Sequence, residues 1–199
     1  MRHIVVFCDR DDTLIRTNYQ GYYYITKPEQ VMFCTGALEG LRKLKESHVK
    51  IFIITNQNGI CDGTISREVL DAIHSVIRAK VIESGGYIDG ISTTVGEGHC
   101  LAKTEAIIRQ REYQYAMMDK ADSLSCWMIG DLESDIEAGK RSWCRTIHIW
   151  YPESEFYIAT DGDPAIAKSH LPENKPQTNA DYEADNFREA IEIILKHEG

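Results

Sequence analysis

Apolar residues follow two alternating patterns along this chain. Short unbroken apolar runs, which are typical of strands buried on both faces, alternate with segments whose apolar positions recur every three or four residues, as in helices with one buried face. The runs predict strands at 3–8, 50–54, 87–95, 126–129 and 145–150, and a short edge strand at 180–185. The periodic segments predict helices that begin after Gly36 and after Ser66, and helices over 103–117, 133–140 and 186–196.

This order of elements predicts an α/β fold, a doubly wound and mostly parallel sheet with helices on both faces. We expect a single domain over residues 1–199, without a large cap domain. Two segments lack a clear period: the tyrosine-rich stretch 15–34 and the polar stretch 151–179. We expect 151–179 to be a loop excursion. We expect 15–34 to be a flap over the functional site, lined by Tyr22, Tyr23 and Tyr24, although these rings would pack equally well on the core or on a partner subunit.

Polar clusters follow three of the predicted strands. They are Asp9-Arg10-Asp11, Thr55-Asn56 and Gly130-Asp131. In a parallel sheet the ligand lies beyond the carboxyl ends of the strands, so these clusters are expected at one edge. Their coincidence is the strongest functional signal in the sequence.

Asp9 and Asp11 alone would be interpreted most simply as a solvated strand end. The alternative is a division of labour, in which one carboxylate attacks phosphorus and the other exchanges a proton with the leaving group. Thr13 would help to turn the chain so that both side chains face one pocket. Asp12 is interpreted as solvated, or as supporting the site from behind.

The other clusters also admit two interpretations. Thr55 and Asn56 suit a phosphate through a hydroxyl and backbone N–H groups, or they form a hydrophilic turn. Lys103, expected at the start of a helix, would neutralise phosphoryl oxygens, although exposed lysines are common. Asp131 would project beside Asp9 and hold Mg²⁺ with it, whereas Asp135 is also explained by a helix dipole.

Taken in chain order, these residues resemble the four-motif series of the haloacid dehalogenase-like phosphohydrolases. The resemblance covers roughly residues 3–150 and the closing helix. More narrowly, Asp-Arg-Asp at 9–11 and Thr-Asn-Gln-Asn-Gly-Ile at 55–60 resemble the histidinol-phosphate and heptose-bisphosphate phosphatase branch. That branch has no large cap between its first two motifs.

The resemblance implies a role for each motif position. Asp9 would be the nucleophile that forms an aspartyl-phosphate, and Asp11 would be the general acid and base. The phosphoryl group would be bound by Thr55, Asn56 and Lys103. Mg²⁺ would be held by the Asp9 carboxylate, the Asp11 backbone carbonyl and Asp131, with support from Asp135 and Thr13.

Three positions depart from the pattern of the branch. Asp12 stands where glycine is usual, and Ala102 stands where an arginine usually precedes the motif lysine. The branch often carries a zinc loop of three cysteines and one histidine, but residues 95–102 offer only His99 and Cys100. We therefore expect no structural zinc.

Composition narrows the class of protein further. Net charge is −9 with a pI near 5.3, which disfavours a nucleic-acid binder. Six scattered cysteines and no recognisable export signal favour reduced, mostly buried thiols in a cytoplasmic protein. No apolar run approaches the ~20 residues of a membrane span. We expect no membrane partner, and a monomer or a small homo-oligomer.

The leading hypothesis is a Mg²⁺-dependent phosphomonoesterase for a small metabolite, with a heptose-like sugar phosphate favoured. Histidinol phosphate and a nucleic-acid 3′-phosphate are the alternative substrates, and the negative charge disfavours the second. A relative that binds phosphorylated ligands without turnover is the alternative outside enzymes.

Overall fold

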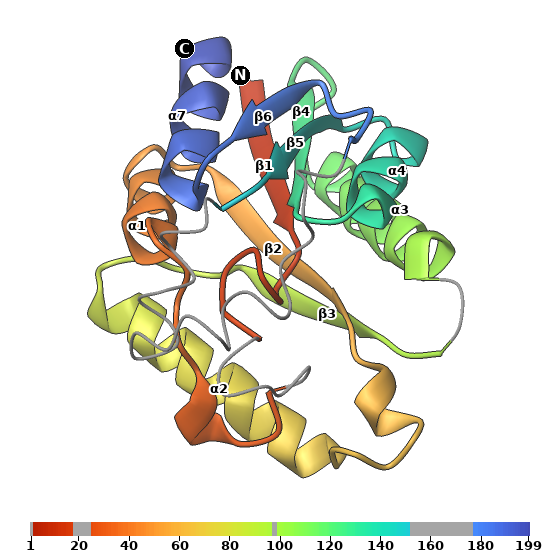
Figure 1. Ribbon diagram of the computed structural model, residues 1–199. Coiled ribbons are helices and arrows are strands. Elements are labelled where there is room, and N and C mark those ends of the chain that lie inside the picture. Colours follow the sequence, from red (N-terminus) through yellow and green to blue (C-terminus); the bar gives the residue numbers. More distant parts are fainter. Residues whose placement is uncertain (1, 18–24, 97–98, 152–176) are drawn as a thin grey trace.

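The computed structural model describes residues 2–17, 25–96, 99–151 and 177–199 (Figure 1). The strands are β1 (Arg2–Cys8), β2 (Lys50–Asn56), β3 (Gly90–Thr94), β4 (Ser123–Gly130), β5 (Arg145–Ile149) and β6 (Tyr182–Ala184). The helices are α1 (Ala37–Glu46), α2 (Arg67–Glu83), α3 (His99–Ala116), α4 (Glu133–Arg141) and α7 (Phe187–Glu198). Short 3-10 turns lie at Pro28–Gln30 and Asn58–Ile60.

The strands form one sheet in the order β3-β2-β1-β4-β5-β6, and every neighbouring pair is parallel. The predicted α/β fold with a parallel sheet is therefore confirmed. The chain builds outward from β1 in one direction and then, from β4, in the other. This reversal between β1 and β4 is the switch point at which doubly wound folds bind their ligands.

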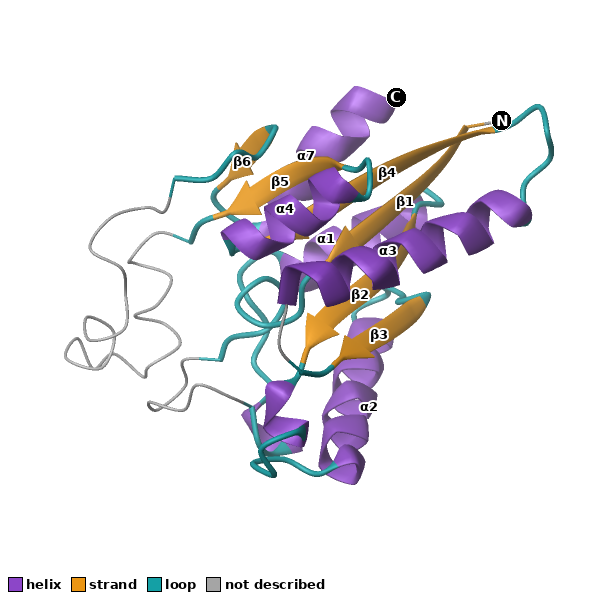
Figure 2. Cartoon of the chain, turned by 90° about the vertical axis from the view of Figure 1, so that its right-hand side faces the viewer, coloured by secondary structure: helices purple, strands orange, loops and turns teal. Residues whose placement is uncertain are grey.

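Alternation along the strands divides the core into two layers. Val6 and Cys8 of β1 pack in the cluster that contains α1, α2 and α7, whereas Val5 and Phe7 pack in the cluster with α3 and α4. Figure 2 shows α3 and α4 on the near side of the sheet and α1 and α7 behind it. A strand covered on both faces needs apolar residues at every position, which is why these strands are continuous apolar runs.

Most element boundaries lie near their predicted places. Ser66 caps α2 as expected, because its hydroxyl accepts a hydrogen bond from the Val69 amide at 3.3 Å. Three boundaries were predicted wrongly. The strand expected at 126–129 begins already at Ser123, because its first residues pair with the start of β1. The strand expected at 87–95 begins only at Gly90, because the Asp89 carboxylate already accepts the Ile51 amide at 2.9 Å. The helix expected from Lys103 begins at His99, so Lys103 lies in its second turn.

The two aperiodic segments are described only in part. Ile15, Ile25, Val31 and Cys34, near the ends of 15–34, are buried in the core. The three tyrosines at 22–24, and residues 152–176, lie outside the described residues, so the flap remains a prediction. All six thiols are free and Cys8, Cys34, Cys126 and Cys144 are buried, as expected. Within the described part of the chain, no helix has both the length and the apolar character needed to cross a bilayer.

Candidate active site

Asp9 lies at the carboxyl end of β1, directly over the switch point. Its amide donates to the Ile129 carbonyl of β4 at 2.9 Å, so the ladder between β1 and β4 extends as far as this residue. Asp131 follows β4 and therefore emerges beside Asp9, as the sequence predicted. Fixed pairing of two buried strands thus sets the separation of the two carboxylates.

Three carboxylates gather at this point. Asp9, Asp131 and Asp135 each offer an oxygen within 4.8 Å of the others. Lys103 joins them, because its Nζ donates to Asp9 Oδ1 at 2.6 Å and to Asp135 Oδ1 at 2.5 Å. We call these four residues the carboxylate cluster. With all three carboxyl groups ionised, the cluster would carry two negative charges beyond the one that Lys103 balances, which is the charge that a divalent cation balances.

Asp135 reaches the cluster only because residue 130 is glycine. A Cβ atom at Gly130 would lie 2.3 Å from the Cβ atom of Asp135, closer than two carbon atoms can approach. The Asp135 carboxylate also accepts the Leu132 amide at 3.1 Å, so it caps the start of α4. The helix-dipole interpretation and the functional one therefore hold together, since one carboxylate caps α4 and pairs with Lys103.

Burial shifts the proton affinities in the cluster. It raises the pKa of Asp9 to about 7, against the opposing charge of Lys103. Burial, followed by the charges of Asp135 and Asp9, raises the pKa of Asp131 well above its usual range. Burial would lower the pKa of Lys103, but Asp135 and Asp9 outweigh it and raise that pKa, so the ammonium keeps its charge. The cluster is thus a fixed cation beside two carboxyl groups, Asp9 and Asp131, whose ionisation is favoured by further positive charge.

The backbone conformation at position 12 explains why Asp12 can replace the usual glycine. Its φ is 51°, in the left-handed region where glycine is favoured and aspartate is tolerated. Its carboxylate accepts the Thr17 amide at 3.0 Å and also the Thr17 hydroxyl, and burial raises its pKa. Of the two interpretations of Asp12, a solvated side chain or one that supports the site, the structure favours the second, because these bonds hold the half-buried carboxylate inside the turn.

The turn also fixes Thr13, which holds Asp131 in place. The Thr13 hydroxyl donates to Asp131 Oδ1 at 3.0 Å, and the Tyr151 hydroxyl donates to the Thr13 carbonyl at 2.8 Å. The Thr13 hydroxyl therefore holds a candidate metal ligand in place.

Asp11 points away from the carboxylate cluster and into a second group of residues. Arg10, which is 1% exposed, donates to both Asp11 oxygens through Nε and one terminal nitrogen, at 2.8 to 3.0 Å. Gln57 Nε2 donates to Asp11 Oδ2 at 2.7 Å. The other terminal nitrogen of Arg10 lies 3.2 Å from His74 Nε2 on α2. We call Asp11, Arg10, Gln57 and His74 the Asp11 clamp.

The two phosphate-binding candidates on β2 lie at the same edge. Thr55 is fully buried, and its hydroxyl accepts from Gln57 Nε2 at 2.9 Å and donates a long hydrogen bond to Asp11 Oδ2 at 3.5 Å. The Asn56 side chain is hydrogen-bonded to Asn58 at 3.2 Å and to Thr94 at 3.1 Å. The structure thus brings Thr55 next to the clamp and holds Asn56 against β3 and the following turn.

Sequence reasoning gave no role to Arg10, Gln57 or His74. The sequence does contain one indication for His74, because it follows Leu70 by one helical turn and is a polar residue beside the apolar stripe of α2. Arg10 gave another signal, because it is a charged residue two positions after the end of a buried strand. Neither signal identifies its partner.

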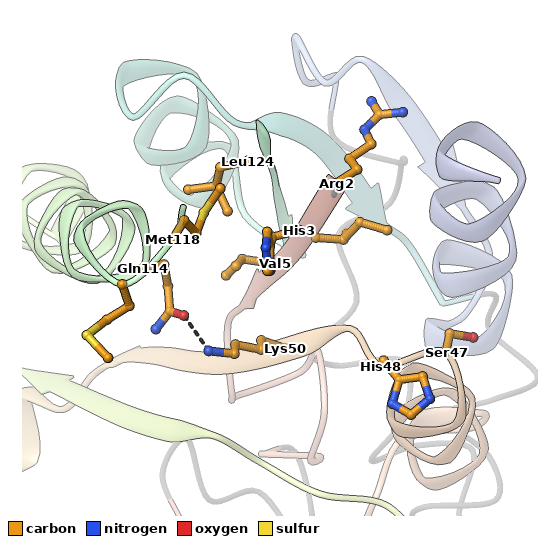
Figure 3. A pocket seen from close by; sticks show the side chains of 11 residues that line it. Arg2, His3, Val5, Ser47, His48, Lys50, Gln114, Met118 and Leu124 are labelled. Atoms are coloured by element: carbon orange, nitrogen blue, oxygen red, sulfur yellow. Dashed lines mark hydrogen bonds between the residues drawn. The ribbon is translucent and has the colours of Figure 1, made fainter. Parts of the chain in front are cut away.

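A cavity of about 350 Å³ lies at the opposite edge of the sheet. Its walls include Arg2, His3, Lys50 and Gln114, and Lys50 Nζ donates to the Gln114 side chain at 2.6 Å (Figure 3). The cavity is lined by the first half of β1, residues 2–5, whereas Asp9 follows the other end of the strand. The cavity is therefore not part of the candidate active site.

Comparisons with known proteins agree with the motif order. No protein-family model matches the chain. D-glycero-alpha-D-manno-heptose-1,7-bisphosphate 7-phosphatase of Photorhabdus laumondii subsp. laumondii is 28% identical over 165 residues, covering 76% of this chain and 86% of that protein. D-glycero-beta-D-manno-heptose-1,7-bisphosphate 7-phosphatase of Rhodopseudomonas palustris is 29% identical over 146 residues, covering 70% and 79%.

The fold has matching solved structures. The crystal structure of D,D-heptose 1.7-bisphosphate phosphatase from B. bronchiseptica, complexed with magnesium and phosphate, superposes with a TM-score of 0.67 at 18% identity. The superposition covers 97% of this chain and 98% of the heptose-bisphosphate phosphatase chain. Fold, motif order and sequence agree, and in all three the chain is similar to the haloacid dehalogenase-like phosphatases of the branch that contains the heptose-bisphosphate phosphatases.

Proposed function

We propose that this phosphatase hydrolyses the phosphate monoester of a small sugar phosphate through an aspartyl-phosphate on Asp9. The observation that carries the proposal is the carboxylate cluster at the switch point, where Lys103 pairs with Asp9 and Asp135. A nucleophilic carboxylate must stay ionised although buried, and an ammonium within 2.6 Å favours that form.

The reaction has two halves. In the first, an Asp9 oxygen attacks phosphorus, the ester P–O bond breaks, and Asp11 gives a proton to the departing alcohol oxygen. In the second, water attacks the phosphoryl group of Asp9 and gives a proton to Asp11. Phosphate leaves, and both carboxyl groups return to their starting state.

The donor set fits Mg²⁺. The cluster offers hard carboxylate oxygens, two of its negative charges are not balanced by Lys103, and Thr13 holds Asp131 in place. We assign the Asp9 carboxylate, the Asp11 backbone carbonyl and Asp131 as ligands, with Asp135 in support. When bound, Mg²⁺ neutralises charge on the phosphoryl oxygens and on the attacking carboxylate.

Thr55, Asn56 and Lys103 are the proposed phosphoryl-binding groups. The Thr55 hydroxyl accepts a hydrogen bond from Gln57 and donates only a long one, 3.5 Å, to Asp11, which it would exchange for a bond to a phosphoryl oxygen. Asn56 ends β2 at the same edge of the sheet. Lys103 contributes a fixed charge that is in place before the substrate arrives, which lowers the cost of reorganisation during the reaction.

A phosphorylated sugar is the favoured substrate, and among sugars we favour a heptose bisphosphate. Two relatives at 28% and 29% identity carry that activity in their names. Histidinol phosphate is the second candidate, since the motifs also resemble that branch. A nucleic-acid 3′-phosphate is disfavoured by the net charge of −9.

The test is release of inorganic phosphate from a panel of esters, with and without Mg²⁺. The panel contains D-glycero-D-manno-heptose 1,7-bisphosphate, hexose phosphates, histidinol phosphate and a 3′-phosphorylated oligonucleotide. We expect Mg²⁺-dependent turnover that is fastest on a sugar phosphate. Preference for histidinol phosphate or the oligonucleotide would overturn the substrate assignment, and equal turnover by Asp9→Asn would overturn the mechanism.

A further inference from the structure

We infer that His74, acting through Arg10, fixes the orientation of the Asp11 carboxylate and is a positioning residue for its proton transfers. The inference rests on the proposed function, because it concerns how Asp11 performs the role given to it there. His74 lies 64 residues from Arg10 in the chain and belongs to neither the motif series nor the carboxylate cluster.

The Arg10 guanidinium is hydrogen-bonded on one side to Asp11 and on the other side to His74. Its Nε and one terminal nitrogen donate to Asp11, and its other terminal nitrogen points to His74 Nε2 at 3.2 Å. Two parallel hydrogen bonds from one guanidinium fix a carboxylate in direction as well as in distance. An arginine that is 1% exposed has few other partners within reach, so the place of His74 determines where the guanidinium can sit.

The hydrogen bond requires a neutral imidazole. A guanidinium has only donors, so His74 Nε2 must be the acceptor and the ring proton must lie on Nδ1. Burial and the charge of Arg10 lower the pKa of His74 to about 4, which keeps the ring neutral. The neutral ring therefore accepts a hydrogen bond from Arg10 and does not act as a second cation that could pair with the Asp11 carboxylate.

The remaining contacts of Asp11 are not sufficient to direct its carboxylate. Gln57 Nε2 donates to one Asp11 oxygen at 2.7 Å, and Thr55 lies near the same oxygen at 3.5 Å. The other oxygen receives its hydrogen bonds from Arg10 alone among the described contacts. If Arg10 is not fixed, only Oδ2 of Asp11 keeps its hydrogen bonds, and the carboxylate can rotate.

The experiment compares His74→Leu, which fills a similar volume without an acceptor, with His74→Gln, which keeps an acceptor near the place of Nε2. Turnover is measured on glycerol 3-phosphate, whose alcohol leaves poorly, and on p-nitrophenyl phosphate, whose phenolate leaves readily. We expect His74→Leu to lower kcat roughly 10-fold on the first ester and less than about 3-fold on the second, with KM little changed. His74→Gln should restore most of the loss.

Ser75→Ala is the matched control. Ser75 is the exposed neighbour of His74 on α2, and its hydroxyl bonds only to the Asp71 carbonyl in the described structure. It should leave both activities unchanged. Equal losses on the two esters in His74→Leu, or no loss on either, would overturn the inference. If the leucine variant does not fold, His74→Ala replaces it with the same expectations.

A second measurement separates this inference from the proposed function. We expect the Arg10 guanidinium protons to give NMR signals protected from solvent exchange in the wild type and in His74→Gln, and to exchange at least about 10-fold faster in His74→Leu. Unchanged exchange would show that His74 does not hold Arg10. A wild type without phosphatase turnover would overturn the proposed function, and the NMR result would still decide whether the clamp exists.

Discussion

The carboxylate cluster and the Asp11 clamp occupy the same edge of one sheet but balance charge in different ways. The cluster has three acids and one lysine, whereas the clamp has one acid, one arginine, an amide and a neutral histidine. Buried charges need partners within hydrogen-bond distance. The clamp meets this requirement with protein groups, and the cluster leaves room for two further positive charges.

This difference separates two tasks that use neighbouring residues. Asp9 and Asp11 are two positions apart, yet only Asp9 joins the group of carboxylates that lie within 4.8 Å of each other. A group that binds a cation must remain under-neutralised, whereas a group that carries protons must be oriented and kept away from the cation. The fold achieves both by turning the two side chains toward different elements.

The largest expected effect comes from removing the attacking charge. Asp9→Asn keeps the shape of the side chain but not its nucleophilicity, so phosphate release should fall roughly 1000-fold or more. Steady-state assays of phosphate release measure this, and circular dichroism checks the fold. Asp71→Asn, on the exposed side of α2, is the matched control. Retention of substantial turnover would argue against a covalent aspartyl-phosphate.

The second largest effect is a loss of stability when Lys103 loses one of its two carboxylate partners. Asp135→Asn leaves a buried ammonium with one carboxylate partner in place of two, and should lower the free energy of unfolding by roughly 3 kcal/mol. Denaturant titration of the metal-free protein measures it. If the loss were below about 1 kcal/mol, Asp135 would not be a principal partner of Lys103.

Asp131→Asn should behave in the opposite way. The pKa of Asp131 is raised by burial and by neighbouring acids, so the metal-free variant should be at least as stable as the wild type. The Mg²⁺ concentration for half-maximal activity should rise roughly 100-fold, because a proposed ligand is lost. A variant with unchanged Mg²⁺ dependence would remove Asp131 from the ligand set.

Removing the proton carrier should give a selective loss. Asp11→Asn should lower turnover of an alkyl phosphate roughly 100-fold, and turnover of an aryl phosphate much less, because a good leaving group needs little protonation. Comparing kcat for the two esters measures the selectivity. Equal loss on both would mean that Asp11 acts through structure or through the metal site, and the contrast between clamp and cluster would fail.

The smallest effect is on the pH dependence of stability. The pKa of His74 is lowered from its usual 6.5 to about 4 by burial and by Arg10. Between these values the unfolded chain takes up a proton that the folded protein does not, so stability is full above pH 6.5 and falls as the pH approaches 4. From pH 7 to 5 the wild type should lose up to about 2 kcal/mol more than His74→Gln.

Urea titrations of both proteins at several pH values measure this difference. The subtraction is needed because buried acids such as Asp9, with a raised pKa, act in the opposite direction in both proteins. Parallel pH profiles for the two proteins would show that His74 is not held neutral by the fold.

The pattern of apolar and polar residues is sufficient to predict the fold class and the edge of the sheet at which the candidate site lies. Continuous apolar runs require strands that are covered on both faces, and such strands pair in parallel, so Asp9, Thr55 and Asp131 had to emerge at one edge. The order of the motifs then indicated phosphoryl transfer. None of this needed a side-chain contact to be known.

The tertiary structure alone decided which charges pair. Periodicity assigns a residue to a face of a helix, but it does not fix the start of α3, and only the start at His99 places Lys103 in the second turn, between Asp9 and Asp135. Likewise, Arg10 and His74 are 64 residues apart in the chain, and only the fold brings the His74 ring on α2 within 3.2 Å of the Arg10 guanidinium. Pairing of buried charges depends on distances of a few ångströms between segments far apart in the chain, and such distances are set by packing rather than by local pattern.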